Sequence, residues 1–253
     1  KENTHIGIDD SFLEGADEFD IAASAQAYVE QLIKIVMSKA KHLNDSDNLV
    51  YGGGVALNCS ANRFLGDYFE NIWLMPNPGD AGNSLGAAAL GYGRKLNWKN
   101  AFLGTDIVGV YPIIETIKAL KKDKIVGIAS GRAEFGPRAL GTRSLLADPR
   151  GPKIKSEVNK IKKRQQFRPF APMILEELVD DYFEMPSHWK NSPYMQVTAP
   201  CKHPKKFPAI VHKDGTSRVQ TVPDDGTGIR RLLEAWYEET GCPILLNTSL
   251  NVR

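Results

Sequence analysis

Three consecutive glycines, Gly52–Gly54, directly follow the short apolar run NLVY, and a segment with helical character, CSANRFLGDYF, comes next. A strand that passes through glycines into a helix lets backbone N–H groups approach a phosphate, and the helix N-terminus adds positive potential. The same glycines suit an ordinary turn, which is the commoner role of such a triplet. A second strand, NIWLMP, and a loop that opens a helix near Asn83 complete an α/β pattern for this half.

Apolar residues at helical spacing dominate the region before these glycines. After residue 107, helices and strands are expected in mixed order. Apolar residues recur every three or four positions across 19–43, which predicts a long helix packed against a sheet. The elements expected after residue 108 are a helix over 112–124, a strand over 125–130, two helices separated by an extended segment within 155–183, a strand pair around an Asp214-Gly215 turn, a helix over 228–240 with Gly241 as its C-cap, and a buried strand over 242–251. This mixture predicts an α+β unit.

The composition is that of an ordinary globular protein, with 42% apolar and 25% charged residues in a chain of 253, which fits one or two domains. No run of 18 apolar residues and no signal-peptide core is visible, so we expect no membrane association. The three cysteines, Cys59, Cys201 and Cys242, are far apart and lack CxxC spacing. That spacing argues against a disulfide framework or a zinc site and indicates a reducing, cytoplasmic location.

Positive charge is concentrated between residues 130 and 170, where eleven Lys or Arg side chains accompany three acids in a chain of net charge +2. A solvated surface explains many basic runs. Here about half of the cations are arginines beside Gly and Pro, as in EFGPRALGTRSLLADPR, and arginine carries a permanently charged fork that is costly to bury without an anion. This favours a phosphate-binding cleft, whereas the lack of interleaved aromatic residues speaks against nucleic acid as the partner.

Two polar positions each fit two roles. Asp80, between glycines in PGDAGNSLG, suits a cap of the helix that begins near Asn83 and also suits a metal or nucleotide ligand; spacing alone favours the cap. His212 lies at the predicted hairpin, where a histidine more often makes structural hydrogen bonds than acts as an acid or base. Arg218 is the better candidate because it would bring another guanidinium to the anion cleft.

Seven collinear motifs give the chain a family resemblance over nearly its whole length. They are GGGVALNCSANRFL, PNPGDAGNSLGAAALG, GRAEFGPRALGTRSLLADPR, KKRQQFRPFAPMIL, SPYMQV, HKDGTSRVQTV and TGCPILLNTSLN. In this order they resemble the O-carbamoyltransferases of the nodulation and antibiotic-tailoring type. The resemblance implies that residues 1–107 form part of an actin-like ATPase (ASKHA) domain, its second lobe, and that residues 108–253 form a threonylcarbamoyl-AMP synthase-like α/β domain.

The chemistry implied by the resemblance has two steps. Carbamoyl phosphate and ATP give carbamoyl-AMP and pyrophosphate in the second domain, and the first domain then transfers the carbamoyl group to a hydroxyl of a small molecule or sugar. Mg²⁺, and iron or a similar metal in a full-length first domain, are the implied metals. Several negative charges meet in such a cleft, so fixed cations would offset the repulsion between the reactants.

The resemblance also implies which residues form the sites. Catalytic roles fall to Lys162, Arg164 and Arg138. ATP or carbamoyl phosphate would contact Arg143, Arg168, Arg218, Ser249 and Asn251. In the first half the nucleotide would contact Gly53, Gly54 and Asn58, and Asp80 becomes a metal ligand rather than a cap.

The chain departs from the family pattern in several places. The His-x-x-x-His metal motif of the first lobe is missing, since no two histidines are four residues apart. Gln165 stands where an acid is common and Leu250 where Phe is common, the latter a mild change because the residue stays apolar. The chain resembles the C-terminal portion of a longer enzyme, and we therefore expect it to form the adenylate but not to complete the transfer.

Two other functions stay open at this point. A tRNA-modifying threonylcarbamoyl enzyme shares the fold family, but EFGPRALG and HKDGTSRVQTV match the O-carbamoyl pattern. The other alternative is a non-catalytic nucleotide- or anion-binding module, against which the intact set of Lys162, Arg164, Ser249 and Asn251 favours retained chemistry. Acceptor pockets are built from variable loops, so the sequence leaves the acceptor and the oligomeric state open.

Overall fold

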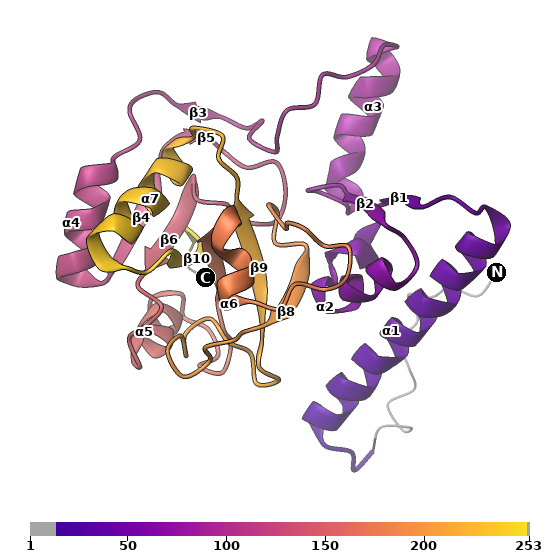
Figure 1. The fold of residues 1–253 in the computed structure, drawn as a ribbon, viewed down its shortest axis with the longest axis horizontal. Coiled ribbons are helices and arrows are strands. Elements are labelled where there is room, and N and C mark those ends of the chain that lie inside the picture. Colours follow the sequence, from indigo (N-terminus) through magenta and orange to yellow (C-terminus); the bar gives the residue numbers. More distant parts are fainter. Residues whose placement is uncertain (1–13, 252–253) are drawn as a thin grey trace. The chain divides into compact units, whose positions relative to one another are not determined.

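The computed structural model of the chain describes residues 14–251 and divides into two compact units, Lys1–Ser46 and Asp47–Arg253. The first unit contains one long helix, α1 (Glu18–Leu43), which confirms the helix predicted for 19–43 (Figure 1). The Asp17 side chain caps this helix by accepting a hydrogen bond from the Phe19 amide at 2.8 Å. Its first turn is acidic and its last turn is basic, which complements the helix dipole. The packing of α1 against a sheet stays a prediction.

The second unit begins with a two-stranded parallel sheet, which confirms both strands predicted for this region. These strands are β1 (Asn48–Tyr51) and β2 (Asn71–Leu74). The segment between them is helical, as predicted, but consists of three short turns: η2 (Gly54–Leu57), α2 (Cys59–Asn62) and η3 (Arg63–Asp67). Another short turn, η4 (Asp80–Gly82), leads into α3 (Asn83–Tyr92).

A six-stranded mixed sheet forms the centre of the same unit, with the strand order β4-β6-β10-β7-β9-β8. Its strands are β4 (Ile125–Ala129), β6 (Arg143–Ala147), β7 (Ala171–Leu175), β8 (Val197–Pro200), β9 (Thr216–Val222) and β10 (Ile244–Ser249). Neighbouring strands are antiparallel, except that β7 and β9 are parallel.

The remaining elements surround this sheet and complete a mixture of helices and strands, as the sequence predicts. They are β3 (Asp106–Ile107), which pairs with β5 (Gly131–Arg132), and α4 (Ile113–Asp123), α5 (Ile154–Ile161), η5 (Glu176–Leu178), α6 (Val179–Tyr182) and α7 (Gly228–Thr240). The assignment of residues 1–107 to an actin-like lobe stays a prediction.

Both faces of the six-stranded sheet are covered, since its strands contribute buried apolar side chains to two separate clusters. On one face Met173 and Leu175 pack with Trp236 of α7, and α4 lies beside α7 there (Figure 1). Ile174, between them in sequence, belongs to the opposite cluster, which includes Val158 of α5. Since the side chains of a strand alternate between faces, one strand contributes to both cores.

The strand pair predicted around Asp214-Gly215 is wrong in its first strand. Residues 207–211 form turns instead, and Phe207 fills the core from them. Pro208 has no backbone N–H to donate to a strand ladder, which disfavours a strand at this point. The turn itself is present, and β9 after it pairs with β7 and β8 from earlier in the chain.

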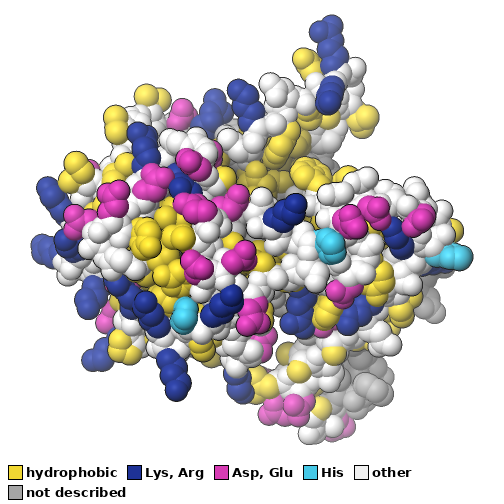
Figure 2. Space-filling view, in the orientation of Figure 1, with side chains coloured by type: hydrophobic (Ala, Val, Ile, Leu, Met, Phe, Trp, Pro, Cys, Tyr) yellow, Lys and Arg dark blue, Asp and Glu magenta, His cyan; other side chains and the backbone are white. Residues whose placement is uncertain are grey.

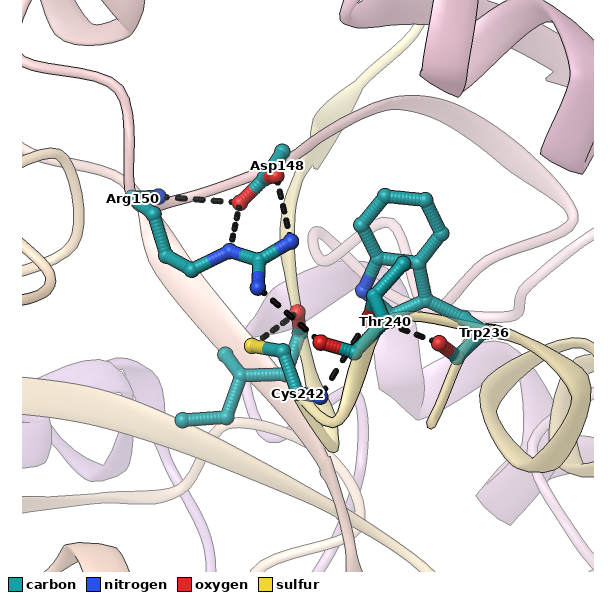
Figure 3. Close-up of polar contacts among 6 residues, drawn as sticks. Asp148, Arg150, Trp236, Thr240 and Cys242 are labelled. Carbon is teal, nitrogen blue, oxygen red and sulfur yellow. Dashed lines mark hydrogen bonds and ion pairs between the residues drawn. The ribbon is translucent and has the colours of Figure 1, made fainter. Parts of the chain in front are cut away.

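Arg150, one of the arginines in the basic stretch, has a structural role (Figure 3). Its guanidinium makes a bidentate pair with Asp148, with Nε–Oδ1 and Nη2–Oδ2 distances of 2.8 and 2.7 Å. Its Nη1 donates to the Thr240 carbonyl at 3.2 Å, and the guanidinium carbon lies 5.8 Å from the centre of the Trp236 ring. The anion that meets this arginine is therefore a carboxylate of its own loop, and the contact ties that loop to the end of α7.

Replacing Arg150 by alanine should lower the free energy of unfolding by about 1–3 kcal/mol, because charge-assisted hydrogen bonds are lost and Asp148 is left unpaired. Urea unfolding followed by tryptophan fluorescence measures the change. Lys205→Ala, at an exposed position, is the control and should change the same quantity by less than about 0.5 kcal/mol. Equal losses in the two variants would contradict the structural role of Arg150.

Gly228, the first residue of α7, lies so close to Tyr111 that an added Cβ would be 2.3 Å from the tyrosine Cβ and Cγ atoms. The Tyr111 hydroxyl donates to the Gly141 carbonyl at 2.8 Å, which holds the ring in place. Gly228→Ala should therefore destabilise the chain by about 1–3 kcal/mol through overpacking. At Gly86 in α3 a Cβ meets nothing within 4 Å, so Gly86→Ala should be neutral or stabilising by about 0.5–1 kcal/mol. Thermal unfolding compares the variants; an unchanged midpoint for Gly228→Ala would refute the tight contact.

Candidate functional site

Lys162, the residue after α5, directs its ammonium group at the end of β10. Nζ donates to the Ser249 carbonyl (2.6 Å) and hydroxyl (3.2 Å) and to the Asn251 carbonyl (3.2 Å) and Oδ1 (2.7 Å). The residue is only 6% exposed. Burial, followed by the nearby Arg164 and Arg168, lowers the pKa of Lys162 to about 8. The structure thus brings Lys162 together with Ser249 and Asn251, as the family resemblance implies.

Arg164 is held in a fixed orientation next to Lys162. Its Nε donates to Asn159 Oδ1 at 2.6 Å, and its guanidinium carbon lies 4.3 Å from the centre of the Phe170 ring. Burial, followed by Arg168 and Arg218, lowers the pKa of Arg164 to about 10. The hydrogen bond and the ring contact orient the guanidinium without neutralising it.

Arg138 joins these cations from the loop before β6. Burial, followed by the neighbouring Arg218, lowers the pKa of Arg138 to about 10. Its Nη2 donates to the Leu57 carbonyl at 3.2 Å. In Arg218 the Nε atom is buried and has no hydrogen-bond partner among the described residues. A buried donor atom without a partner is costly even on a half-buried side chain, so this position favours a bound acceptor.

We call five of these residues the cationic cluster: Arg138, Lys162, Arg164, Arg168 and Arg218. Their charges repel one another. Arg218 lowers the pKa values of Arg138 and Arg164, and Arg168 lowers those of Arg164 and Lys162. No carboxylate is among the causes of the three pKa shifts. Partly buried positive charge without a counter-charge is unfavourable until an anion binds, and several cations together suit a polyanion.

Arg143, predicted to contact phosphate, is engaged elsewhere. Its two terminal nitrogens donate to the backbone carbonyls of Ser130 (3.2 Å), Thr142 (2.7 Å), Thr105 (2.9 Å) and Gly131 (3.1 Å). These carbonyls accept the hydrogen bonds of both terminal guanidinium nitrogens, which a phosphate would need as donors. The geometry therefore assigns Arg143 to holding the loops around β5, outside the cationic cluster.

His212 and Asp214 have structural contacts, as expected for a histidine at a turn. Asp214 Oδ1 accepts hydrogen bonds from the Thr216 amide (3.0 Å) and hydroxyl (2.8 Å), and the His212 amide donates to the Thr216 carbonyl (2.7 Å). Burial is the main cause that lowers the pKa of His212. The turn leads directly into β9, which carries Arg218 to the cluster.

The glycines predicted to contact a nucleotide lie on a loop that adjoins the cluster. Gly53 has a positive φ of 98°, and its N–H donates to the Pro78 carbonyl at 2.8 Å. Gly53 and Gly54 are exposed, and a Cβ at either would meet nothing within 4 Å. The Leu57 carbonyl that accepts from Arg138 closes the same loop, so the glycine loop and the basic stretch meet there.

Asn58 caps a helix, whereas Asp80 does not, although spacing alone favours a cap at Asp80. Asn58 Oδ1 accepts a hydrogen bond from the Ala61 amide at 3.1 Å and so caps α2. Asp80 does not cap α3, whose N-cap is Gly82; it begins η4 with an exposed side chain. Within residues 14–251 no three His, Cys, Asp or Glu side chains are grouped as metal ligands, so the described residues do not build a metal centre by themselves. Metal binding by Asp80 stays a prediction.

Two residues that the sequence analysis did not single out hold the loops of the site. Asn159 is fully buried, and its Nδ2 donates to the Arg168 carbonyl at 2.9 Å. Glu134 Oε1 accepts from the backbone amides of Leu140 (2.7 Å) and Thr142 (2.9 Å) and fixes the loop that carries Arg138. A signal for Asn159 was available, since an asparagine in the buried stripe of an amphipathic helix needs partners.

On the face drawn in Figure 2, Lys and Arg side chains are interspersed with Asp and Glu and form no continuous band. No helix within residues 14–251 combines the length and the apolar character that a membrane span requires.

Curated relatives share the chain's sequence over most of its length. The chain is 34% identical to Nodulation protein NolNO of Sinorhizobium fredii, over 92% of the chain and 39% of that protein. It is 35% identical to Nodulation protein U of the same species (92% and 45%) and 35% identical to the uncharacterized protein sll1178 of Synechocystis sp. (93% and 47%). The chain thus spans less than half the length of these relatives.

One solved structure and two family profiles also match the chain, and the profiles carry the assignment. Full-length HypF, solved in a phosphate- and nucleotide-bound form, matches with a TM-score of 0.38 and 24% identity, over 61% of this chain and 19% of HypF. The profile described as Carbamoyltransferase N-terminus matches residues 5–89, and the profile described as Carbamoyltransferase C-terminus matches residues 117–253. The second match alone covers more than half of the chain, which therefore belongs to the carbamoyltransferase family.

Proposed function

We propose that the chain is the part of an O-carbamoyltransferase that activates carbamoyl phosphate with ATP, and that the cationic cluster binds the phosphate groups of both substrates. Membership of the carbamoyltransferase family supports the reaction class. The observation that carries the proposal is the cluster itself. Lys162 is buried and held by Ser249 and Asn251, and no carboxylate is among the causes that lower the pKa values of Arg138, Lys162 and Arg164. A polyanion supplies the missing negative charge.

The proposed activation conserves atoms if water first splits carbamoyl phosphate into carbamate and inorganic phosphate. A carbamate oxygen then attacks the α-phosphorus of ATP, the bond to the bridging oxygen breaks, and pyrophosphate leaves carbamoyl-AMP behind. Negative charge grows on the departing pyrophosphate. Lys162 and Arg164 would stabilise that charge, because both are fixed before the reaction begins.

We assign this activation to residues 108–253 and the transfer of the carbamoyl group to an acceptor hydroxyl, on a small molecule or sugar, to a domain of which residues 1–107 form part. Gly53, Gly54 and Asn58 would contact the nucleotide in the transfer domain. The exposed glycine loop, with open space at both glycine Cα atoms, supports this assignment. Mg²⁺ would accompany ATP as its counter-ion.

Exchange of labelled pyrophosphate into ATP tests the activation step. We expect exchange that depends on carbamoyl phosphate, and Lys162→Ala and Arg164→Ala should each lower its rate by about 10²-fold, since removing one fixed donor to a developing negative charge has that effect. The control is Lys163→Met, which removes an exposed charge between the two residues. The wild-type rate should persist in this variant.

Two outcomes of the exchange assay would count against the proposal. If the chain binds ATP but catalyses no exchange, it is a binding module. If Lys163→Met reduces the rate as much as the other two variants do, net charge rather than the placed groups accounts for the effect.

The lowered pKa of Lys162 predicts proton uptake when ATP binds. At pH 8, near the pKa of about 8, roughly half of the unliganded molecules carry a neutral amine, and a bound polyanion favours the ammonium form. Calorimetric titration in two buffers of different ionisation enthalpy should therefore report up to about half a proton taken up at pH 8 and close to none at pH 6.5. Lys162→Met should abolish the uptake at pH 8, and Lys163→Met should retain it. The same uptake in Lys162→Met would show that another group titrates.

A further inference from the structure

A cavity of about 880 Å³ lies at the start of α7, on the face of the sheet opposite to Phe170 and Arg164. No residue of the cationic cluster lines it. Its volume and mostly apolar lining are typical of a site for a small organic molecule. The proposed carbamoyl chemistry makes no use of this cavity.

The apolar part of the lining is aromatic. Trp98, Phe102 and Tyr111 all contribute to it. Tyr111 is anchored by the hydrogen bond from its hydroxyl to the Gly141 carbonyl at 2.8 Å. Trp98 also lines a second cavity together with Tyr194. Fixed aromatic rings offer stacking area at little cost in side-chain entropy.

The polar part of the lining is positive. Arg132, Arg231 and Lys99 line the cavity, and no Asp or Glu of the described chain does so. Arg231 forms no ion pair within residues 14–251, and Arg132 donates only to the Leu103 carbonyl, at 3.5 Å. Both arginines therefore keep donors available for an anion.

Two further features of the cavity favour an anion. Thr142 is 7% exposed, and its hydroxyl oxygen is buried with no hydrogen-bond partner among the described residues. The N-terminus of α7, a helix of 13 residues, also contributes to the lining through Gly228 and Ile229. The positive end of the helix dipole adds to the field of the arginines.

We propose that this cavity binds a small aromatic anion, with its ring against Trp98 and Phe102 and its carboxylate or phosphate group on Arg132 and Arg231. The site is separate from the cationic cluster, none of whose residues lines the cavity. The proposal is independent of the carbamoyl chemistry, so either can fail alone.

Two fluorescent probes that differ mainly in one charged group test this inference. 1-Anilinonaphthalene-8-sulfonate carries a sulfonate, and N-phenyl-1-naphthylamine is its neutral counterpart. The anionic probe should bind the chain at least about ten-fold more tightly, because a charge-assisted hydrogen bond contributes roughly that factor. Equal affinities, or no saturable binding of either probe, would overturn the proposal.

Variants locate the probe within the molecule. Arg231→Met should weaken the anionic probe about ten-fold and leave the neutral probe unchanged, whereas Trp98→Leu should weaken both. Lys205→Met removes an exposed charge outside the cavity and should change neither. Trp98→Phe keeps an aromatic ring and should restore binding, which separates a lost platform from a folding defect. No effect of Arg231→Met would overturn the site.

Competition identifies the anionic group that the site prefers. 1-Naphthyl phosphate and 1-naphthoate are added to the bound sulfonate probe. Displacement by either supports the site and ranks phosphate against carboxylate, and displacement by neither contradicts it.

Discussion

The candidate site depends on the repulsion between like charges and on the neutral oxygen atoms that offset it. An ammonium group buried beside two arginines is unfavourable unless polar atoms surround it. Here the carbonyls and side-chain oxygens of Ser249 and Asn251 accept hydrogen bonds from Lys162 Nζ. Asn159 Oδ1 accepts a hydrogen bond from Arg164, whose guanidinium also lies over the Phe170 ring. Neutral acceptors stabilise each cation without cancelling its charge, so the field stays available to a ligand.

The central sheet makes this arrangement possible. β10 lies in the interior of the sheet, between β6 and β7, and its last residue therefore has a fixed position. The loop before β6, the end of α5 and β9 converge on that end of β10 although they are far apart in sequence. The half-buried Glu134 and the fully buried Asn159 then bind the loop backbones, so that the loops are held by the scaffold.

Periodicity predicted α7 because that helix buries a regular apolar pattern. The same spacing predicted α1, although only Ile33 and Met37 are buried in it. Periodicity failed at 207–211, where side chains enter the core from turns that have no period. The arginines show a different limit, since the sequence does not distinguish a fork that meets phosphate from one that meets carbonyls or a carboxylate. Arg143 and Arg150 find such partners 38 and 90 residues away, in Thr105 and Thr240. Lys162, Arg164, Ser249 and Asn251 were predictable as a group because their motifs carry the family resemblance.

The backbone of Lys163 explains how the side chains of Lys162 and Arg164 come close to each other. In a continuous helix two residues at this spacing point about 200° apart around the axis. Lys163 instead adopts a left-handed conformation with φ of 49°, which reverses the chain direction just after α5. At position 163 the backbone conformation is thus restricted, whereas the charge of the side chain is not. Glycine or asparagine would preserve the geometry, while a β-branched residue would turn Arg164 away from Lys162.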